Sequence, residues 1–129
     1  MKMRPKKDRF QIEHILADKF YEHRGEFNDK PEFDKFRNSL GALILLQAGT
    51  NQSLSDMPYS KKVKHYAKEN VLAKSLTPIQ YENVPKFMRF KKESGLQFRS
   101  YEKFTKLEIK ERMELYKKIC EEIWSLKNF

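Results

Sequence analysis

Residues 9–16 read Arg-Phe-Gln-Ile-Glu-His-Ile-Leu, and this stretch is decisive because it predicts the first strand of the fold. Apolar Phe10 and Ile12 alternate with polar neighbours, which is the two-residue period of a short β-strand. His14 falls at or near the end of that strand. Adjacent side chains on a strand point to opposite faces, so Glu13 and His14 can serve one site only if the strand ends or bends there. A lone acid–histidine pair is therefore a weak signal, because most single histidines are structural.

The segments that follow alternate between polar loops and apolar periodic stretches. Residues 20–31 are polar and rich in turn formers, which predicts a loop. A helix is predicted next by apolar residues at helical spacing, namely Phe33, Phe36 and Leu40. The apolar run 42–46 lies between glycines and predicts a second strand that pairs with the first. Pro58 suits the first turn of a helix whose apolar face comprises Tyr59, Val63, Tyr66, Ala67 and Val71.

Two further helices are predicted in the C-terminal half of the chain. The first covers about residues 84–92 and ends at Ser94-Gly95. The second starts near Thr105, because Thr105 and Glu108 have the spacing of a capping box. Its apolar residues repeat every three or four positions and predict a buried core stripe, formed by Ile109, Met113, Tyr116, Cys120, Ile123 and Trp124. We interpret this stripe as core and not as a cofactor site.

Composition narrows the class of protein. A length of 129 residues suits one domain, and 27 Lys and Arg against 18 Asp and Glu leave a net charge of +9. This charge favours an anionic partner such as a nucleic acid, although a solubilising surface would have the same composition. The single cysteine, Cys120, excludes an internal disulfide and indicates a reducing compartment. No segment has the length and apolarity of a membrane helix or a signal peptide, so we expect a cytoplasmic protein without a membrane partner.

A polar connector between the second strand and the following helix contains a possible partner for Glu13. Asn51 lies in this connector, and a hairpin brings the end of its first strand near the segment that follows its second strand. The side-chain oxygen of Asn51 could then complete a metal site with Glu13. Asparagine beside glycine is equally typical of a turn, so spacing alone leaves both interpretations open.

Several ordered motifs together are more specific than any one of them. From residue 10 onward the chain resembles the HNH-type (His-Me finger) nuclease domain at the C-terminus of GmrSD-like modification-dependent restriction proteins. The motifs that carry the resemblance are Ile12-Glu-His-Ile15, Arg37-Asn-Ser-Leu-Gly-Ala-Leu-Ile-Leu-Leu46, Asn51-Gln-Ser53, Pro58-Tyr59-x-x-Lys62-x-x-x-Tyr66, Ile109-x-x-Arg112 and Ile123-Trp124.

The resemblance implies a fold and an activity. The fold would be α+β, with a ββα-metal core embedded in additional α-helices and a long C-terminal helix. Residues 1–8 would form a basic tail and residues 9–129 a single nuclease domain that is a fragment of a larger multidomain protein. The activity would be metal-dependent hydrolysis of DNA phosphodiester bonds in restriction or phage defence. A nucleotide-hydrolysing partner domain would precede this domain in the complete protein, since no glycine-rich phosphate loop occurs here.

The same resemblance assigns roles to individual residues. His14 would be the general base that activates water. Glu13 and Asn51 would be ligands of a divalent metal, and their oxygen atoms suit Mg²⁺ or Mn²⁺. Lys62 is the first choice for a phosphate contact, whereas a solvated helix face is the simpler interpretation of Lys61. The full set of candidate DNA contacts comprises Lys62, Lys61, Arg37, Asn38 and Gln52.

Two positions depart from the pattern of HNH domains. Ala17 stands where many have proline, and Ala42 stands where many have an asparagine that helps to orient the histidine loop. Asn38 or a backbone group could take over that function. A catalytically decayed HNH-like module that only binds nucleic acid is therefore the alternative hypothesis.

Overall fold

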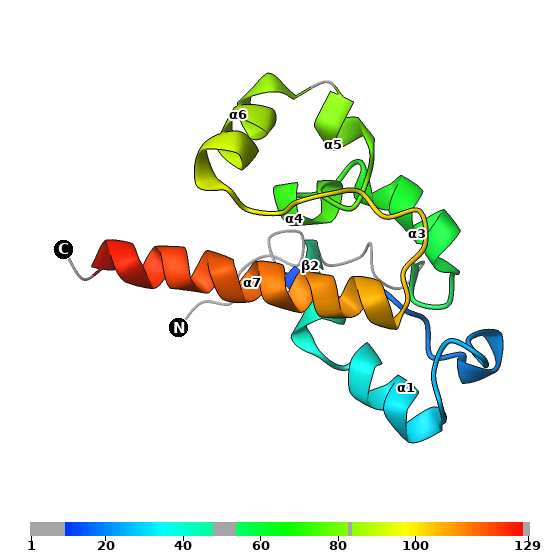
Figure 1. Cartoon of the computed structure of the whole chain (residues 1–129). Helices are drawn as coiled ribbons and strands as arrows, with labels where there is room; N and C mark the ends of the chain where they lie inside the picture. The colour runs from blue at the N-terminus through cyan, green and yellow to red at the C-terminus, as the bar shows by residue number, and fades with distance from the viewer. Residues whose placement is uncertain (1–9, 48–53, 83, 128–129) are drawn as a thin grey trace, which may run out of the picture.

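A two-stranded antiparallel sheet forms the centre of the computed structural model, which describes residues 10–47, 54–82 and 84–127 (Figure 1). Strand β1 (Phe10–His14) pairs with β2 (Leu43–Gln47), and His14 lies opposite Leu43 in the register. Both predicted strands are confirmed. The fold is mixed α+β, with helices in most of the remaining chain and a long helix at the C-terminal end.

The sheet has one buried face and one open face. Glu13 and its cross-strand neighbour Ile44 are buried, whereas the opposing pair Ile12 and Leu45 is more than half exposed. Residues directly opposite each other in an antiparallel pair point to the same face, and successive residues alternate. Glu13 therefore points into the core, while His14 points to the other face of the strand.

Helix α1 (Lys30–Arg37) follows a short 3-10 turn, η2 (Phe20–Glu22), and a loop. Its start has a local cause, because the Asp29 carboxylate accepts a hydrogen bond from the Glu32 amide at 2.9 Å. Phe33 is fully buried and contacts the rings of Phe20 and Phe27. The helix packs through this aromatic cluster and ends at Asn38, just before the second strand is reached.

A second 3-10 turn, η3 (Leu40–Ala42), lies directly against the C-terminal helix α7 (Lys106–Lys127). A Cβ atom added to Gly41 would lie 2.3 Å from the Ile109 carbonyl oxygen and 2.6 Å from Met113 Cγ. Glycine at this position therefore allows the two backbones to approach closely.

Helix α3 (Tyr59–Tyr66) starts after Pro58, as predicted, but ends earlier than its apolar pattern suggested. Val71 was expected on the same buried face and is instead 56% exposed, in the separate helix α4 (Val71–Lys74). The cause is Asn70. Its side chain accepts a hydrogen bond from the Ala73 amide at 3.1 Å and donates one to the Leu45 carbonyl at 2.7 Å, so it starts a new helix beside β2.

The remaining helices follow their local signals. Helix α5 (Ile79–Glu82) precedes α6 (Pro85–Ser94), which ends at Gly95 with φ +71°, a left-handed conformation that favours glycine. The predicted helix near residues 84–92 and its end at Gly95 are confirmed. A second, smaller core joins α6 and the segment after it to α7, through Phe87, Leu96, Phe98 and Leu115.

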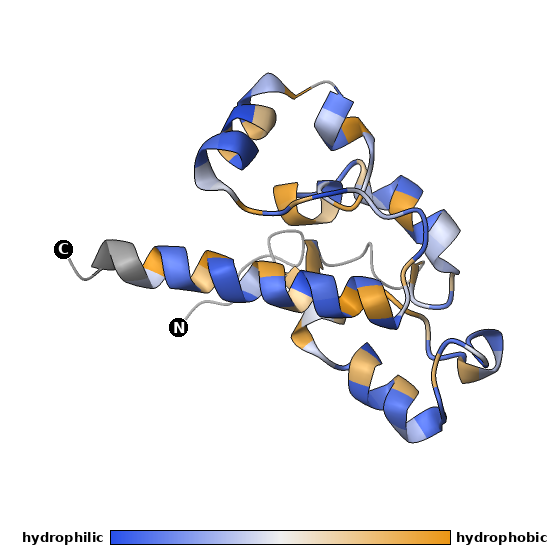
Figure 2. Cartoon of the chain, viewed as in Figure 1, coloured by the Kyte–Doolittle hydropathy of each residue, from blue (hydrophilic) through white to orange (hydrophobic). Residues whose placement is uncertain are grey.

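Helix α7 begins as predicted, because the Glu108 carboxylate accepts a hydrogen bond from the Thr105 amide at 2.8 Å. The prediction of a continuous core stripe is wrong beyond its first turns. Ile109 is buried, but exposed side chains occur farther along at Met113, Cys120, Ile123 and Trp124. The C-terminal part of α7 extends past the short sheet (Figure 1). Hydrophobic residues nevertheless recur along the helix (Figure 2). Within the described residues, no helix is long and apolar enough to cross a membrane.

Candidate functional site

His14 occupies the last position of β1, where its side chain is half-buried. Its ring nitrogen Nε2 lies 2.9 Å from the side-chain oxygen Oδ1 of Asn38, the residue that caps the C-terminal end of α1. The Asn38 amide nitrogen Nδ2 in turn donates a hydrogen bond to the Asp34 carbonyl at 2.8 Å. The imidazole is therefore held at one nitrogen by the end of a helix.

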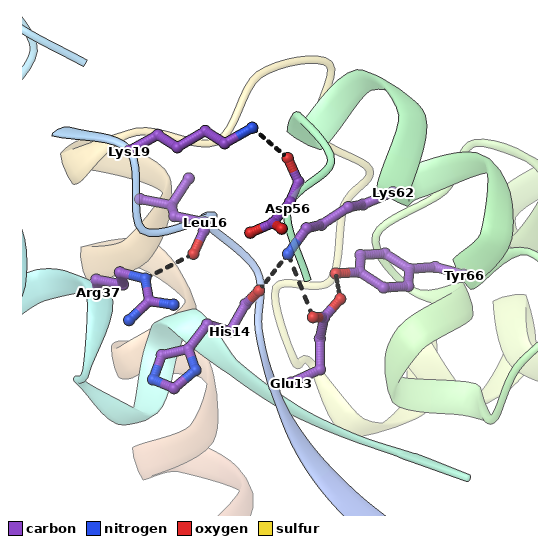
Figure 3. A network of polar contacts seen from close by, with 8 residues as sticks. All are labelled: Glu13, His14, Leu16, Lys19, Arg37, Asp56, Lys62 and Tyr66. Carbon is purple, nitrogen blue, oxygen red and sulfur yellow. Dashed lines mark hydrogen bonds and ion pairs between the residues drawn. The ribbon is translucent and has the colours of Figure 1, made fainter. Parts of the chain in front are cut away.

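Glu13, the neighbour of His14, is 1% exposed and has partners on both carboxylate oxygens. The Lys62 ammonium lies 3.2 Å from Oε1, and the Tyr66 hydroxyl donates a hydrogen bond to Oε2 at 2.7 Å (Figure 3). Lys62 is itself fully buried. Because Lys62 and Tyr66 are four residues apart, they lie on the same face of α3 and together close over the carboxylate.

Burial shifts the pKa values of the two residues that contact Glu13. Burial lowers the pKa of Lys62, and the nearby Glu13 carboxylate opposes that shift. Burial also raises the pKa of Tyr66, and the Glu13 carboxylate raises it further. Tyr66 therefore keeps its proton at neutral pH and remains a hydrogen-bond donor to Glu13.

The backbone around His14 is fixed from both sides. The Lys62 ammonium donates a hydrogen bond to the His14 carbonyl at 2.7 Å, and Arg37 Nε donates one to the Leu16 carbonyl at 2.8 Å. Figure 3 shows these side chains converging on the strand end from α3 and α1, with the Arg37 guanidinium on the same side as the His14 ring. The segment from Glu13 to Leu16 is thus clamped between two helices.

The comparison with protein families agrees with the motifs in the sequence. Residues 2–119 match the family described as GmrSD restriction endonucleases, C-terminal domain. The chain belongs to this family. No curated protein and no solved structure matched the chain.

Membership of the GmrSD family gives the domain a role related to restriction endonucleases and makes DNA the substrate class of the family. The match includes β1, β2, α3 and most of α7. His14, Glu13 and Lys62 therefore lie inside the part of the chain that matches the GmrSD C-terminal domain.

The other candidate residues of this GmrSD domain differ in exposure and in the contacts they make. Asn51 and Gln52 lie outside the described residues. Lys61 is exposed on α3. Arg37 is half-buried, and its Nε donates a hydrogen bond to the Leu16 carbonyl. The Asn38 side chain is hydrogen-bonded to the His14 ring. Lys62, the first choice for a phosphate contact, is buried and directed to Glu13 in this structure.

Ala42, where the sequence departs from the expected HNH pattern, is fully buried in the hydrophobic core of this GmrSD domain. Its carbonyl accepts a hydrogen bond from the Ile15 amide at 2.8 Å, which holds the residue after His14 to the start of β2. A backbone contact thus remains at this position although the side chain is apolar.

Within the described part of the GmrSD domain, no group of three or more His, Cys, Asp and Glu side chains is arranged to hold a metal ion. Both oxygens of Glu13 are occupied by Lys62 and Tyr66, so this carboxylate does not fit a metal ligand in this conformation.

Sequence reasoning missed three contacts in this site. It did not pair Glu13 with Lys62 and Tyr66, which are 49 and 53 residues away. The four-residue spacing of Lys62 and Tyr66 indicated only that these two share a face of α3. It considered Asn38 as a substitute for the asparagine missing at Ala42, but nothing in the sequence predicted a direct contact with the His14 ring.

Proposed function

We propose that this domain is an HNH-type endonuclease that hydrolyses phosphodiester bonds in DNA with a divalent cation, Mg²⁺ or Mn²⁺, in restriction or antiviral defence. The observation that supports this best is His14. It is a half-buried imidazole at a strand end, held at one ring nitrogen by Asn38 and at its carbonyl by Lys62. A general base needs this combination of a fixed orientation and access to water.

In the proposed reaction, His14 accepts a proton from the water molecule that attacks the phosphorus atom, while the P–O bond to the leaving strand end breaks and its oxygen takes up a proton from solvent. Holding the water and the phosphate in line also lowers the barrier to the reaction. Lys61 is exposed in the first turn of α3, and Arg37 carries a second cationic group beside the strand end. Both are better placed than buried Lys62 to meet a phosphate group, and a net charge of +9 attracts the DNA backbone more generally.

Metal dependence is part of this proposal, with Glu13 and Asn51 as the ligands that the family resemblance implies. The Glu13 carboxylate would first have to leave Lys62 and Tyr66, because it is paired with both. The proposal also includes a nucleotide-hydrolysing partner domain, as the resemblance to GmrSD proteins implies. It further includes a cytoplasmic location.

The test is cleavage of supercoiled plasmid DNA by the native chain in Mg²⁺, Mn²⁺ or EDTA. We expect nicking or linearisation that requires the metal and falls by at least about a hundredfold in His14→Ala. His65→Ala is the matched control, because His65 is an exposed histidine on α3 and should leave cleavage unchanged.

A catalytically decayed nucleic-acid-binding module is the second candidate function. Two observations favour it. The Ala42 side chain is apolar and buried in the core, and both carboxylate oxygens of Glu13 already have partners in Lys62 and Tyr66. Plasmid binding that weakens steeply with salt, without cleavage in either metal, would support the module and refute the nuclease.

A further inference from the structure

We propose that Asn38 is the positioning residue of this site: it fixes the tautomer and the orientation of His14, so that Nδ1 is the ring nitrogen that accepts the proton. This inference rests on the proposed function, because it specifies how the general base is prepared. It assigns Asn38 to the histidine and not to the DNA backbone.

The orientation of the Asn38 amide follows from its second partner. Its Nδ2 atom lies 2.8 Å from the Asp34 carbonyl oxygen. A carbonyl oxygen can only accept a hydrogen bond, so the group facing Asp34 must be the NH₂ group. The oxygen Oδ1 is then the atom that faces His14.

The tautomer of His14 follows from the same logic. Oδ1 can only accept, and it lies 2.9 Å from His14 Nε2, so Nε2 must carry the hydrogen. A neutral imidazole carries one ring hydrogen and one lone pair. The lone pair is therefore on Nδ1, the nitrogen that remains to take a proton from water.

Asn38 is itself rigidly placed. Its backbone amide also donates a hydrogen bond to the Asp34 carbonyl, at 3.1 Å, so backbone and side chain both hold the residue to the last turn of α1. The preceding residue, Arg37, holds the Leu16 carbonyl. The end of α1 thus fixes both the His14 ring and the backbone just beyond it, while Lys62 holds the His14 carbonyl from α3.

The position of Asn38 also explains how the site tolerates Ala42. A methyl group at residue 42 cannot hydrogen-bond an imidazole, and it is buried in the core. Asn38 lies four residues earlier, at the start of the same connection into β2, and contacts the ring directly. The orienting group is therefore at the end of α1 and not at position 42 in η3.

A direct test is the ¹⁵N spectrum of the histidine side chains in the full chain, with EDTA present. At about pH 8.5, roughly two units above the usual imidazole pKa, histidine is neutral and its two tautomers have distinct nitrogen shifts. We expect His14 to be entirely in the Nε2–H form in the native chain and a mixture of both forms in Asn38→Ala. Exposed His65 serves as the internal reference.

Cleavage kinetics provide the second readout. We expect Asn38→Ala to lower kcat by at least about tenfold with little change in KM, because the base is misdirected while the DNA contacts remain. Asn38 is exposed, so the variant should fold, and Gln97→Ala is a matched control for loss of an exposed amide.

The outcomes separate this inference from the proposed function. An Nδ1–H form of His14 in the native chain, or unchanged tautomers and kcat in Asn38→Ala, would overturn the role of Asn38 even if the enzyme cleaves DNA. If no chain cleaves DNA, the proposed function fails, and the tautomer comparison still decides whether Asn38 holds His14 as described.

Discussion

Glu13 and Lys62 form a fully buried ion pair in a domain of only 129 residues. Removing two charges from water costs several kcal/mol per ion, so such a pair is maintained only if its remaining hydrogen-bonding capacity is satisfied. Here Tyr66 occupies the second carboxylate oxygen and the His14 carbonyl accepts from the ammonium. The pair therefore joins α3 to the strand end that carries the candidate base.

Lys62→Met leaves Glu13 buried without its cation and should lower the free energy of unfolding by about 3–5 kcal/mol. Urea unfolding measures this. Lys61→Met is the matched control, since Lys61 is exposed and its loss should change stability by no more than about 0.5 kcal/mol.

A double variant refines that prediction. Glu13→Gln combined with Lys62→Met removes both charges, so it should be less destabilised than Lys62→Met alone. Equal stability of Lys62→Met and Lys61→Met would show that the pair contributes nothing.

At the scale of elements, the contact between η3 and α7 determines where β2 begins. Gly41 lies against the backbone of α7, two residues before Leu43 starts β2. The position of His14 depends on this contact in turn, because His14 pairs with Leu43.

Gly41→Ala tests this contact. The added methyl group would collide with the Ile109 carbonyl, a backbone atom that cannot rotate away, so we expect a loss of about 1–3 kcal/mol in the free energy of unfolding. Thermal or urea unfolding is the measurement. Leu40→Ala, in the same turn but 59% exposed, should have a much smaller effect, and a neutral Gly41→Ala would contradict the close approach.

At the scale of the whole molecule, buried tyrosines determine how stability responds to alkaline pH. Burial raises the pKa of four tyrosines above the ordinary value of about 10, namely Tyr59, Tyr66, Tyr81 and Tyr101. The unfolded chain loses these protons first, so the folded state binds more protons above about pH 10 and stability falls as pH rises. Lys62, whose pKa burial lowers, has the opposite sign but is a single group.

We therefore expect the melting temperature to fall steeply as pH rises above roughly 10. Melting curves recorded together with the absorbance of ionised tyrosine would measure this. Tyr59→Phe should make the decline shallower, whereas Tyr21→Phe, at a position 63% exposed, should not. A melting temperature that is constant through this range would contradict the burial of the tyrosines.

The sequence by itself determined the features that depend on a few neighbouring residues. Strand β1, the end of α6 at Gly95 and the Thr105–Glu108 cap all follow from local periodicity or local hydrogen bonds. The position of His14 at a strand end is of the same kind, and so is the match to the family motifs.

Only the tertiary structure decided which side chains meet. Glu13 and Lys62 are 49 residues apart, and His14 and Asn38 are 24 apart, so neither contact has a local signal. The exposed end of α7 is also a tertiary result, because an apolar stripe is buried only where a partner surface exists and the two-stranded sheet is shorter than the helix. Local patterns determine the elements, whereas packing and charge pairing between distant elements determine the site.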